Sequence, residues 1–303
     1  MIRSYLREPE DFIVEEVRQP LPHYVRSSRG MERVAGPYTV FRLTKRNFTT
    51  ADAVRLVAER LGVPRSAVGV AGLKDKFAVT MQYLTAKGDH KGFSTAHVTL
   101  ERIGFNKRAI TTGDLLGNRF TIRLHGIECP FTQPRDVPNF FGDQRFGKDR
   151  KNSLIGKLLL QRTYEQACTL ANVHTLPDKA RLKFFIHAYQ SLLFNSTLEQ
   201  YRKNHTLRGK RGDILGYDSR PTNRAFFSFS HTLLTEDTLS LASFRFDDLR
   251  LMCRGSVRDL AITPQDFSSR KERDTTVVEF FLPKGCYGTV IVDFLLRLTK
   301  DQR

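Results

Sequence analysis

The spacing of apolar residues changes twice along this chain, and this change is the feature that most constrains the fold. Up to about residue 126, apolar and polar residues alternate in short segments, which is typical of half-buried strands. From Leu154 the apolar residues recur at helical spacing, and strand composition returns at Thr275–Leu282. Segments in this order predict an α+β fold.

Individual elements follow from the same patterns. The expected strands are Phe12–Val17, Tyr38–Thr44, Ala67–Ala71, Phe77–Leu84, His97–Phe105, Arg119–Gly126 and Thr275–Leu282. The expected helices are Thr49–Leu61, Leu154–Leu170, Asp178–Arg202 and Thr289–Leu298. Arg18–Pro37 is predicted to be a loop or a mobile basic flap, and Asn204–Asp218 an exposed loop followed by a return to β structure.

Length and composition indicate a folded, cytoplasmic protein. A chain of 303 residues, 40% hydrophobic and 27% charged, is long enough for two lobes. No segment approaches the roughly 20 apolar residues that cross a bilayer. Its four cysteines have no zinc-ligand spacing, so we expect reduced, mostly buried thiols.

The charge favours a polyanionic partner. Forty-nine Lys and Arg against 32 Asp and Glu give a formal net charge of +17, and the pI is about 10.0. Nucleic acid is the leading interpretation. A ribosome-associated surface, an anionic membrane face and plain solubility are the alternatives.

Several reaction classes lack their motifs in this sequence. There is no P-loop, no GxGxxG run after a strand, no HExxH and no GxSxG. We therefore expect no cofactor and no metal. What remains is Asp75, between Lys74 and Lys76 in the connection of two predicted strands; on that feature alone, a solvated turn is the more common reading.

A second segment, Pro138–Gly147, combines three phenylalanines, an asparagine, an arginine and two glycines. Aromatic rings can stack on a splayed-out base, an amide can read its Watson–Crick edge, and a cation can contact phosphate. Core packing is the alternative for the phenylalanines. Arg145 in this segment is the first candidate partner for the Asp75 carboxylate.

Three ordered motifs resemble the TruD/Pus7 family of tRNA pseudouridine synthases. They are Glu10–Glu16 (EDFIVEE), Ala71–Gln82 (AGLKDKFAVTMQ) and Asn139–Gly147 (NFFGDQRFG). Weaker similarities lie at Gln190–Asn195, Arg211–Asp213 and Leu282–Thr289, so the resemblance covers essentially the whole chain.

The resemblance implies a pseudouridine-synthase-like catalytic domain with a mixed or antiparallel sheet. Residues 1–160 and 256–303 would form it, and residues 161–255 would form an inserted α/β (TRUD) domain. The expected molecule is V-shaped and two-lobed, with an RNA-binding cleft between the lobes. The implied activity is that of an isomerase acting on uridine 13 in the D arm of tRNA, without cofactor, in a monomer.

The resemblance also places roles on single residues. Asp75 matches the catalytic aspartate, Asn139 the base-contacting asparagine and Phe141 the stacking phenylalanine. Other expected substrate-site residues are Phe12, Glu16, Lys74, Lys76, Gln82 and Arg145. Independently of the resemblance, charge and position mark Lys148, Arg150, Lys151, Arg202, Lys203, Arg208, Lys210 and Arg211 as candidate contacts to the tRNA backbone. For each of them alone, a solvated surface charge is the more common interpretation.

Two positions depart from the family pattern. Leu6 stands where a basic residue is common, although Arg7 is adjacent, and Asp293-Phe294 stands where an Arg-Glu pair is usual. The main alternative function is a non-catalytic RNA-binding or RNA-chaperone protein, which has no use for a carboxylate beside an anionic ligand. An RNA methyltransferase or nuclease ranks third, because the sequence lacks a Gly-rich cofactor loop and clustered metal-binding carboxylates.

Overall fold

The computed structural model describes residues 2–18, 26–27, 30–31, 36–127 and 130–300. These residues divide into two compact units. The first comprises Met1–Gln133, Pro264–Gly288 and Leu295–Arg303, and the second Pro134–Thr263 and Thr289–Phe294. The domain boundaries predicted at 160 and 255 concern the family's inserted domain and stay a prediction.

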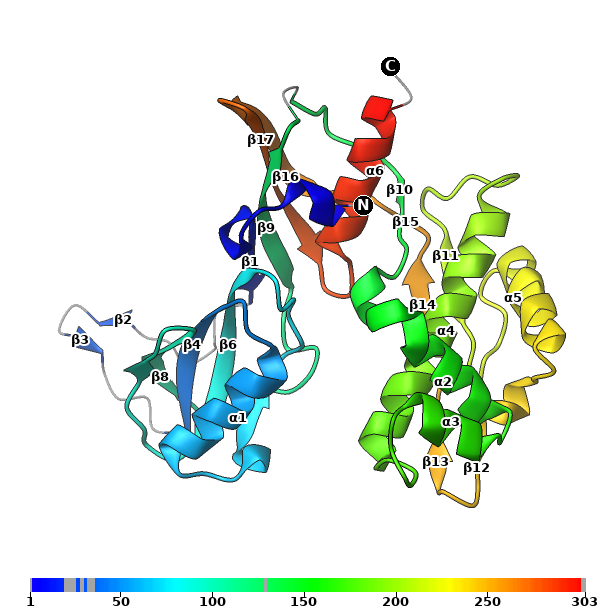
Figure 1. Ribbon diagram of the computed structural model, residues 1–303, viewed down its shortest axis with the longest axis horizontal. Helices are drawn as coiled ribbons and strands as arrows, with labels where there is room; N and C mark the ends of the chain where they lie inside the picture. The colour runs from blue at the N-terminus through cyan, green and yellow to red at the C-terminus, as the bar shows by residue number, and fades with distance from the viewer. Residues whose placement is uncertain (1, 19–25, 28–29, 32–35, 128–129, 301–303) are drawn as a thin grey trace. The chain divides into compact units, whose positions relative to one another are not determined.

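The first unit is built on a mixed sheet, to which the described residues contribute nine strands (Figure 1). Their order is β16-β17-β9-β1-β6-β4-β8-β7, with β5 paired to β6. β1 and β6 are parallel, and the other neighbours are antiparallel. The bounds are β1 Phe12–Val17, β4 Tyr38–Arg46, β5 Val68–Val70, β6 Val79–Lys87, β7 Phe93–Ser94, β8 Val98–Asn106, β9 Gly117–His125, β16 Gln265–Glu272 and β17 Thr275–Pro283.

Helix α1 (Thr50–Leu61) covers one face of this sheet at β4, β6 and β8 (Figure 1). The alternation in β4 points Phe41 and Leu43 to that face, where Ala53 and Val57 of the helix pack against them. Thr49 caps the helix by accepting a hydrogen bond from Asp52 N, and Gly62 ends it at φ 65°. The core beneath the helix thus follows from the alternation of side chains in the strand, with a period of two, and from the helical repeat of 3.6 residues.

The seven predicted strands and the helix over Thr49–Leu61 are confirmed. β6 starts at Val79 rather than at Phe77, which leaves residues 72–78 as a turn outside the sheet. Helix α6 (Gly288–Lys300) confirms the predicted C-terminal helix. Most of Arg18–Pro37 lies outside the described residues; its described part holds the two-residue strands β2 Arg26–Ser27 and β3 Gly30–Met31.

The second unit is mainly helical, with short strand pairs. Its elements are β10 Val137–Pro138, α2 Lys151–Leu160, α3 Tyr164–Leu170, α4 Lys179–Tyr201, β11 Arg211–Ile214, α5 Arg224–Glu236, β12 Arg245–Phe246, β13 Leu251–Met252, β14 Ser256–Asp259 and β15 Ala261–Ile262. One face of α4 packs on α2 through Leu182, Phe185 and Tyr189. Further along, Phe194 and Leu198 pack on Phe226 of α5. α4 is therefore the central element of this unit.

The single helix predicted over Leu154–Leu170 is wrong, because the chain breaks into α2 and α3. Arg162 lies between them at φ 65°, in the left-handed region. Its guanidinium donates to the carbonyl oxygens of Leu160, Ser243 and Arg245, and it stacks over the Phe246 ring at 3.8 Å. These tertiary contacts outweigh the local helical pattern.

The exposed loop predicted at Asn204–Asp218 is also wrong in part. Arg211–Ile214 forms β11, which pairs with β14, and the Asp213 side chain is buried. The Asp213 carboxylate accepts hydrogen bonds from Thr222 N and Asn223 N. A polar residue can be buried once it is hydrogen-bonded, and composition alone does not reveal such a partner.

Helix α5 is a further correction, since β structure was expected after Asp218. Its buried residues Phe226, Ser230 and Leu234 follow helical spacing, and Asn223 caps it by accepting from Phe226 N. The signal was therefore present in the sequence.

In the described part of the chain, no helix has the length and apolar character needed to cross a bilayer. Cys253 is buried, Cys168 and Cys286 are partly exposed, and Cys129 lies outside the described residues.

Gly156 allows α2 to approach α4 closely, and its substitution tests this packing. A Cβ at Gly156 would lie 2.2 Å from the carbonyl oxygen of Phe185. Gly156→Ala should destabilise the protein by about 1–3 kcal/mol, although alanine is the better helix former. Leu154→Ala, at an exposed position of the same helix, should change stability by no more than about 0.5 kcal/mol. Denaturant melts of both variants provide the measurement, and a stabilised Gly156→Ala would contradict the account.

Candidate active site

The turn formed by residues 72–78, called here the Asp75 turn, connects β5 to β6. Thr50 and Gln82, both buried, hold the backbone of this turn. Thr50 Oγ1 accepts from Lys74 N at 2.9 Å and donates to Gln82 Oε1 at 3.3 Å. Gln82 Nε2 donates to the Gly72 carbonyl oxygen at 3.4 Å. A helix N-terminus and a sheet strand therefore both position the turn.

Lys45 provides a third attachment, beside Asp75 itself. Its Nζ donates to the Asp75 carbonyl oxygen at 2.6 Å, and the side chain is 0% exposed. Burial lowers the pKa of Lys45 to about 8, while the negative charge of Asp75 raises this pKa and the positive charge of Lys74 lowers it. A buried cation thus lies in the electrostatic field of the candidate catalytic residue.

Lys74 and Glu16 form a buried ion pair below the turn. Lys74 Nζ lies 3.0 Å from Glu16 Oε2, and the two side chains are 6% and 0% exposed. Glu16 Oε1 also accepts from Tyr83 N at 3.4 Å. The predicted substrate contacts of Lys74 and Glu16 stay predictions. The ion pair supports a positioning role for both residues, because each side chain neutralises the charge of the other.

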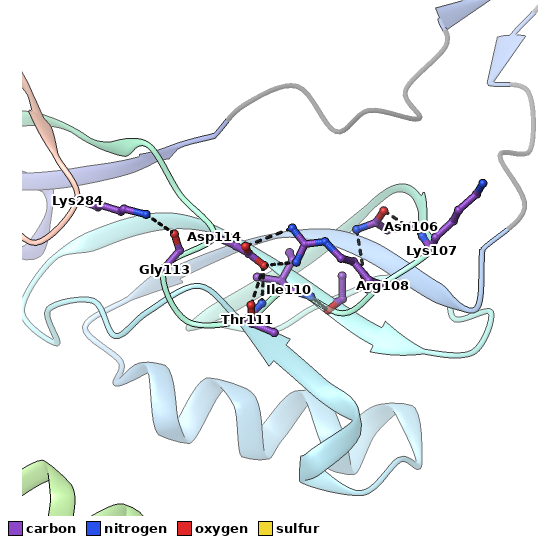
Figure 2. Close-up of polar contacts among 9 residues, drawn as sticks. Asn106, Lys107, Arg108, Ile110, Thr111, Gly113, Asp114 and Lys284 are labelled. Atoms are coloured by element: carbon purple, nitrogen blue, oxygen red, sulfur yellow. Dashed lines mark hydrogen bonds and ion pairs between the residues drawn. The ribbon is translucent and has the colours of Figure 1, made fainter. Parts of the chain in front are cut away.

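A neighbouring loop braces the residue that precedes the turn. Gly113 N donates to the Ala71 carbonyl oxygen at 2.8 Å, and Lys284 Nζ donates to Gly113 O at 3.0 Å. Figure 2 shows this loop, which Arg108 and Asp114 close by an ion pair of 2.8 Å. The hydrogen bond from Arg108 is the largest cause that lowers the pKa of Asp114 to about 2.

The remaining predicted residues of the first unit occupy different environments. Lys76 is exposed, which suits a contact to phosphate. Phe12 is buried, and its ring meets that of Phe120 edge-on at 6.1 Å. Its packing is that of a core phenylalanine, and its predicted place in the active site stays a prediction.

In the second unit, Phe141 is held by its backbone and leaves its ring to other contacts. Phe141 N donates to Asn195 Oδ1 at 2.8 Å, and Asn195 Nδ2 donates back to Phe141 O at 2.9 Å. The Arg258 guanidinium lies over the ring at 4.2 Å, and Phe194 meets the ring edge-on at 5.6 Å. A guanidinium on an aromatic face is a favourable cation–π contact.

Asn139 is joined to the same arginine. Arg258 Nη2 donates to Asn139 Oδ1 at 2.6 Å, Arg258 Nε donates to Asn139 O at 2.9 Å, and Asn139 Nδ2 donates to Asp259 O at 3.0 Å. These contacts fix the orientation of the amide. They use the amide oxygen and one N–H donor of this buried residue.

Arg145, the predicted partner of Asp75, belongs to the second unit. Its Nε donates to Ser191 Oγ at 3.1 Å, and its guanidinium lies 6.0 Å from the centre of the Phe141 ring. The ion pair predicted with Asp75 stays a prediction. Arg145 also contributes to lowering the pKa of the partly buried His187 to about 4, where desolvation is the larger cause.

Sequence reasoning missed Lys45, Asn195 and Arg258. For Lys45 a signal existed: it continues the inward positions of Phe41 and Leu43 in β4, where an unpaired lysine is unusual. Asn195 is the last residue of the segment Gln190–Asn195, which resembles the family but was assigned no role. Arg258 lies 119 residues from Asn139 in the sequence, and no local pattern connects them.

The sequence profile of the family "tRNA pseudouridine synthase D (TruD)" matches residues 2–181 and 209–293. This chain belongs to the TruD family. It is accordingly an isomerase of the class that the sequence motifs predicted.

Individual relatives agree with this membership. The chain is 37% identical to the TruD protein of Anaeromyxobacter sp. strain Fw109-5, with 97% of this chain and 92% of that protein covered. It is 28% identical to the TruD protein of Wolinella succinogenes, with 96% and 94% covered. A crystal structure described as a TruD protein of Methanosarcina mazei covers 96% of the chain at a TM-score of 0.63 and 20% identity, which supports the mixed α+β fold.

The buried pair of Glu16 and Lys74 yields a stability prediction. Glu16→Gln keeps the shape of the side chain but leaves Lys74 as an uncompensated buried charge, so the free energy of unfolding should fall by about 3 kcal/mol. The double variant Glu16→Gln/Lys74→Met removes both charges and should recover most of the loss.

Glu101→Gln is the matched control, because Glu101 pairs with Arg42 at an exposed position. It should cost less than about 1 kcal/mol. Urea melts of the three variants are the measurement. Equal losses for Glu16→Gln and Glu101→Gln would show that burial of the pair has no energetic consequence.

Proposed function

We propose that this chain converts uridine 13 in the D arm of tRNA to pseudouridine, with Asp75 as the catalytic residue and without a cofactor. Membership of the TruD family supports the reaction and the tRNA substrate. The observation that carries the assignment of Asp75 is its backbone setting: buried side chains of Thr50, Gln82 and Lys45 hydrogen-bond to the short turn that bears it. Solvated surface turns do not need such support.

The proposed reaction requires one carboxylate from the protein as its reacting group. The C1′–N1 bond of uridine breaks, the base turns, and a C1′–C5 bond forms; N1 gains a proton and C5 loses one. The electron count is unchanged, so no redox group is required. A carboxylate can trap the electron-poor sugar, add to the pyrimidine or remove a sugar proton.

Base recognition is proposed for Phe141 and Asn139. Extruding a uridine from its stack costs a few kcal/mol, and stacking on an aromatic ring offsets part of that cost. Asn195 fixes the backbone of Phe141, and Arg258 fixes the amide of Asn139. Both groups are therefore preorganised, which avoids an entropic cost on binding.

The net charge of +17 supports tRNA as the partner, since cationic side chains replace the counterions of the phosphates. Residues 161–255 are proposed to correspond to the family's inserted domain, within a pseudouridine-synthase-like architecture.

Asp75→Asn tests the chemical role. The substitution keeps the backbone carbonyl that Lys45 holds, so folding should survive. An amide is neither a nucleophile nor a base here, and tritium release from 5-tritiated uridine in tRNA should fall below detection. Affinity measured by filter binding should stay constant or rise, because a negative charge beside a polyanion is removed.

The matched control is Asp89→Asn, at an exposed carboxylate of the same unit, which should retain normal turnover. Wild-type turnover should also persist in EDTA and without added nucleotide, which tests the proposal that no cofactor is required. Normal tritium release by well-folded Asp75→Asn protein would remove Asp75 from the chemistry. A parallel loss of melting temperature, binding and turnover would make it a structural residue.

Phe141→Leu tests the stacking role. Leucine keeps much of the apolar volume against Phe194 but has no flat π face, so turnover on folded tRNA should lose about 1–3 kcal/mol of transition-state stabilisation. Phe227→Leu, at a partly buried phenylalanine elsewhere in the unit, serves as the control and should leave kcat/KM unchanged. Wild-type kinetics for Phe141→Leu would show that the ring only fills space.

A further inference from the structure

A buried lysine stands at an inward position of the sheet, where the pattern of β4 calls for an apolar residue. Lys45 lies directly opposite Thr80 in β6 and Val98 in β8, so these side chains share one face. Thr80 and Val98 are buried as well. A lysine placed there must desolvate its ammonium, which is unfavourable for the fold.

The neighbouring strands do not offset the desolvation cost of the Lys45 ammonium. Among the described residues, the hydroxyl of the neighbouring Thr80 has no hydrogen-bond partner. Lys45 instead extends to the Asp75 turn, where Nζ donates to the carbonyl oxygen of Asp75 at 2.6 Å. The side chain thus directs its charge to the one residue of the turn that is assigned a chemical role.

We propose that Lys45 is a positioning residue for the isomerisation: it fixes the backbone of Asp75 and supplies the buried positive charge that keeps the neighbouring carboxylate ionised. This inference rests on the proposed catalytic role of Asp75. A carboxylate close to an uncharged pyrimidine loses hydration, and a nearby cation favours its charged form. Lys74 cannot serve equally well, because Glu16 already neutralises it.

The charges around Lys45 determine how it responds to pH. The turn presents Asp75 and Lys74, and β1 presents Glu16 through its pair with Lys74. The neighbouring strands present the neutral Thr80 and Val98. With these groups in place, burial lowers the pKa of Lys45 from 10.5 to about 8.

As the pH rises through the pKa of Lys45, the stability of the fold should increase and the activity should decrease. Because the pKa is lower in the folded protein than in the unfolded chain, the charged lysine destabilises the fold below pH 8. That cost disappears as the pH rises from about 8 towards 10.5. Activity should follow the other direction, since the proposal requires the protonated lysine.

The test compares Lys45→Met, Lys45→Gln and Thr80→Val with the wild type. Lys45→Met keeps a long apolar stem and removes the charge, and Lys45→Gln keeps a neutral donor. Thr80→Val changes the same buried face but removes only a hydroxyl without a partner. Each protein is measured for kcat and KM by tritium release from pH 6 to pH 10, for tRNA affinity by filter binding, and for its thermal melt.

Lys45→Met should lower kcat at pH 7 by about 10²-fold, the scale expected when a reacting group is displaced by about 1 Å. Its tRNA affinity should be unchanged and its melting temperature equal to or above that of the wild type. The alkaline decline of kcat that the proposal expects for the wild type near pH 8 should be absent. Lys45→Gln should also be impaired, because the hydrogen bond without the charge is not sufficient, and Thr80→Val should behave as the wild type.

Two results would overturn the proposal. The first is a wild-type kcat with an unchanged alkaline limb in Lys45→Met. The second is a lowered melt with kcat and affinity lost together, which would make Lys45 a structural residue. Neither result touches the proposed function, which is tested separately by pseudouridine formation in the wild-type protein and its loss in Asp75→Asn protein.

Discussion

The structure of the first unit depends on three buried polar side chains, two from its sheet and one from the first turn of helix α1. Thr50, Gln82 and Lys45 are buried, and each makes a hydrogen bond to the backbone of the Asp75 turn. Buried polar groups stabilise one arrangement only when their partners are in place, so this network specifies the turn more strictly than packing could. The ion pair of Glu16 and Lys74 adds to that specificity. Burying these polar groups costs stability, and such a cost is typical of sites where the geometry of the chain serves function.

The second unit applies the same principle to an aromatic ring. α4 packs on α2 through the close approach at Gly156, and this packing positions Asn195 to hold the backbone of Phe141. Arg258 then links the Phe141 ring to the Asn139 amide. A flat face and a hydrogen-bonding edge are fixed in one cluster, which is the combination that an extruded base needs.

The sequence predicted most of the strands and helices, because their patterns are local. β4 and α1 are read directly from their periods, and the caps Thr49 and Gly62 mark the ends of α1. Predictions failed where distant residues decide. Arg162 breaks a helix by reaching carbonyl groups more than 80 residues away, and the buried Asp213 finds its hydrogen-bond donors at Thr222 and Asn223, just before α5. The motifs led to Asp75, Asn139 and Phe141, whereas the residues that hold them required the fold.

The central claim is that this chain forms pseudouridine at one defined position of tRNA. The most direct measurement maps pseudouridine at single-nucleotide resolution in unmodified tRNA, before and after incubation with the purified protein. The account predicts one new pseudouridine, at position 13 in the D arm, with wild-type protein and none with Asp75→Asn protein. New pseudouridine at another position would contradict the assigned target, and no new pseudouridine in any tRNA tested would contradict the function.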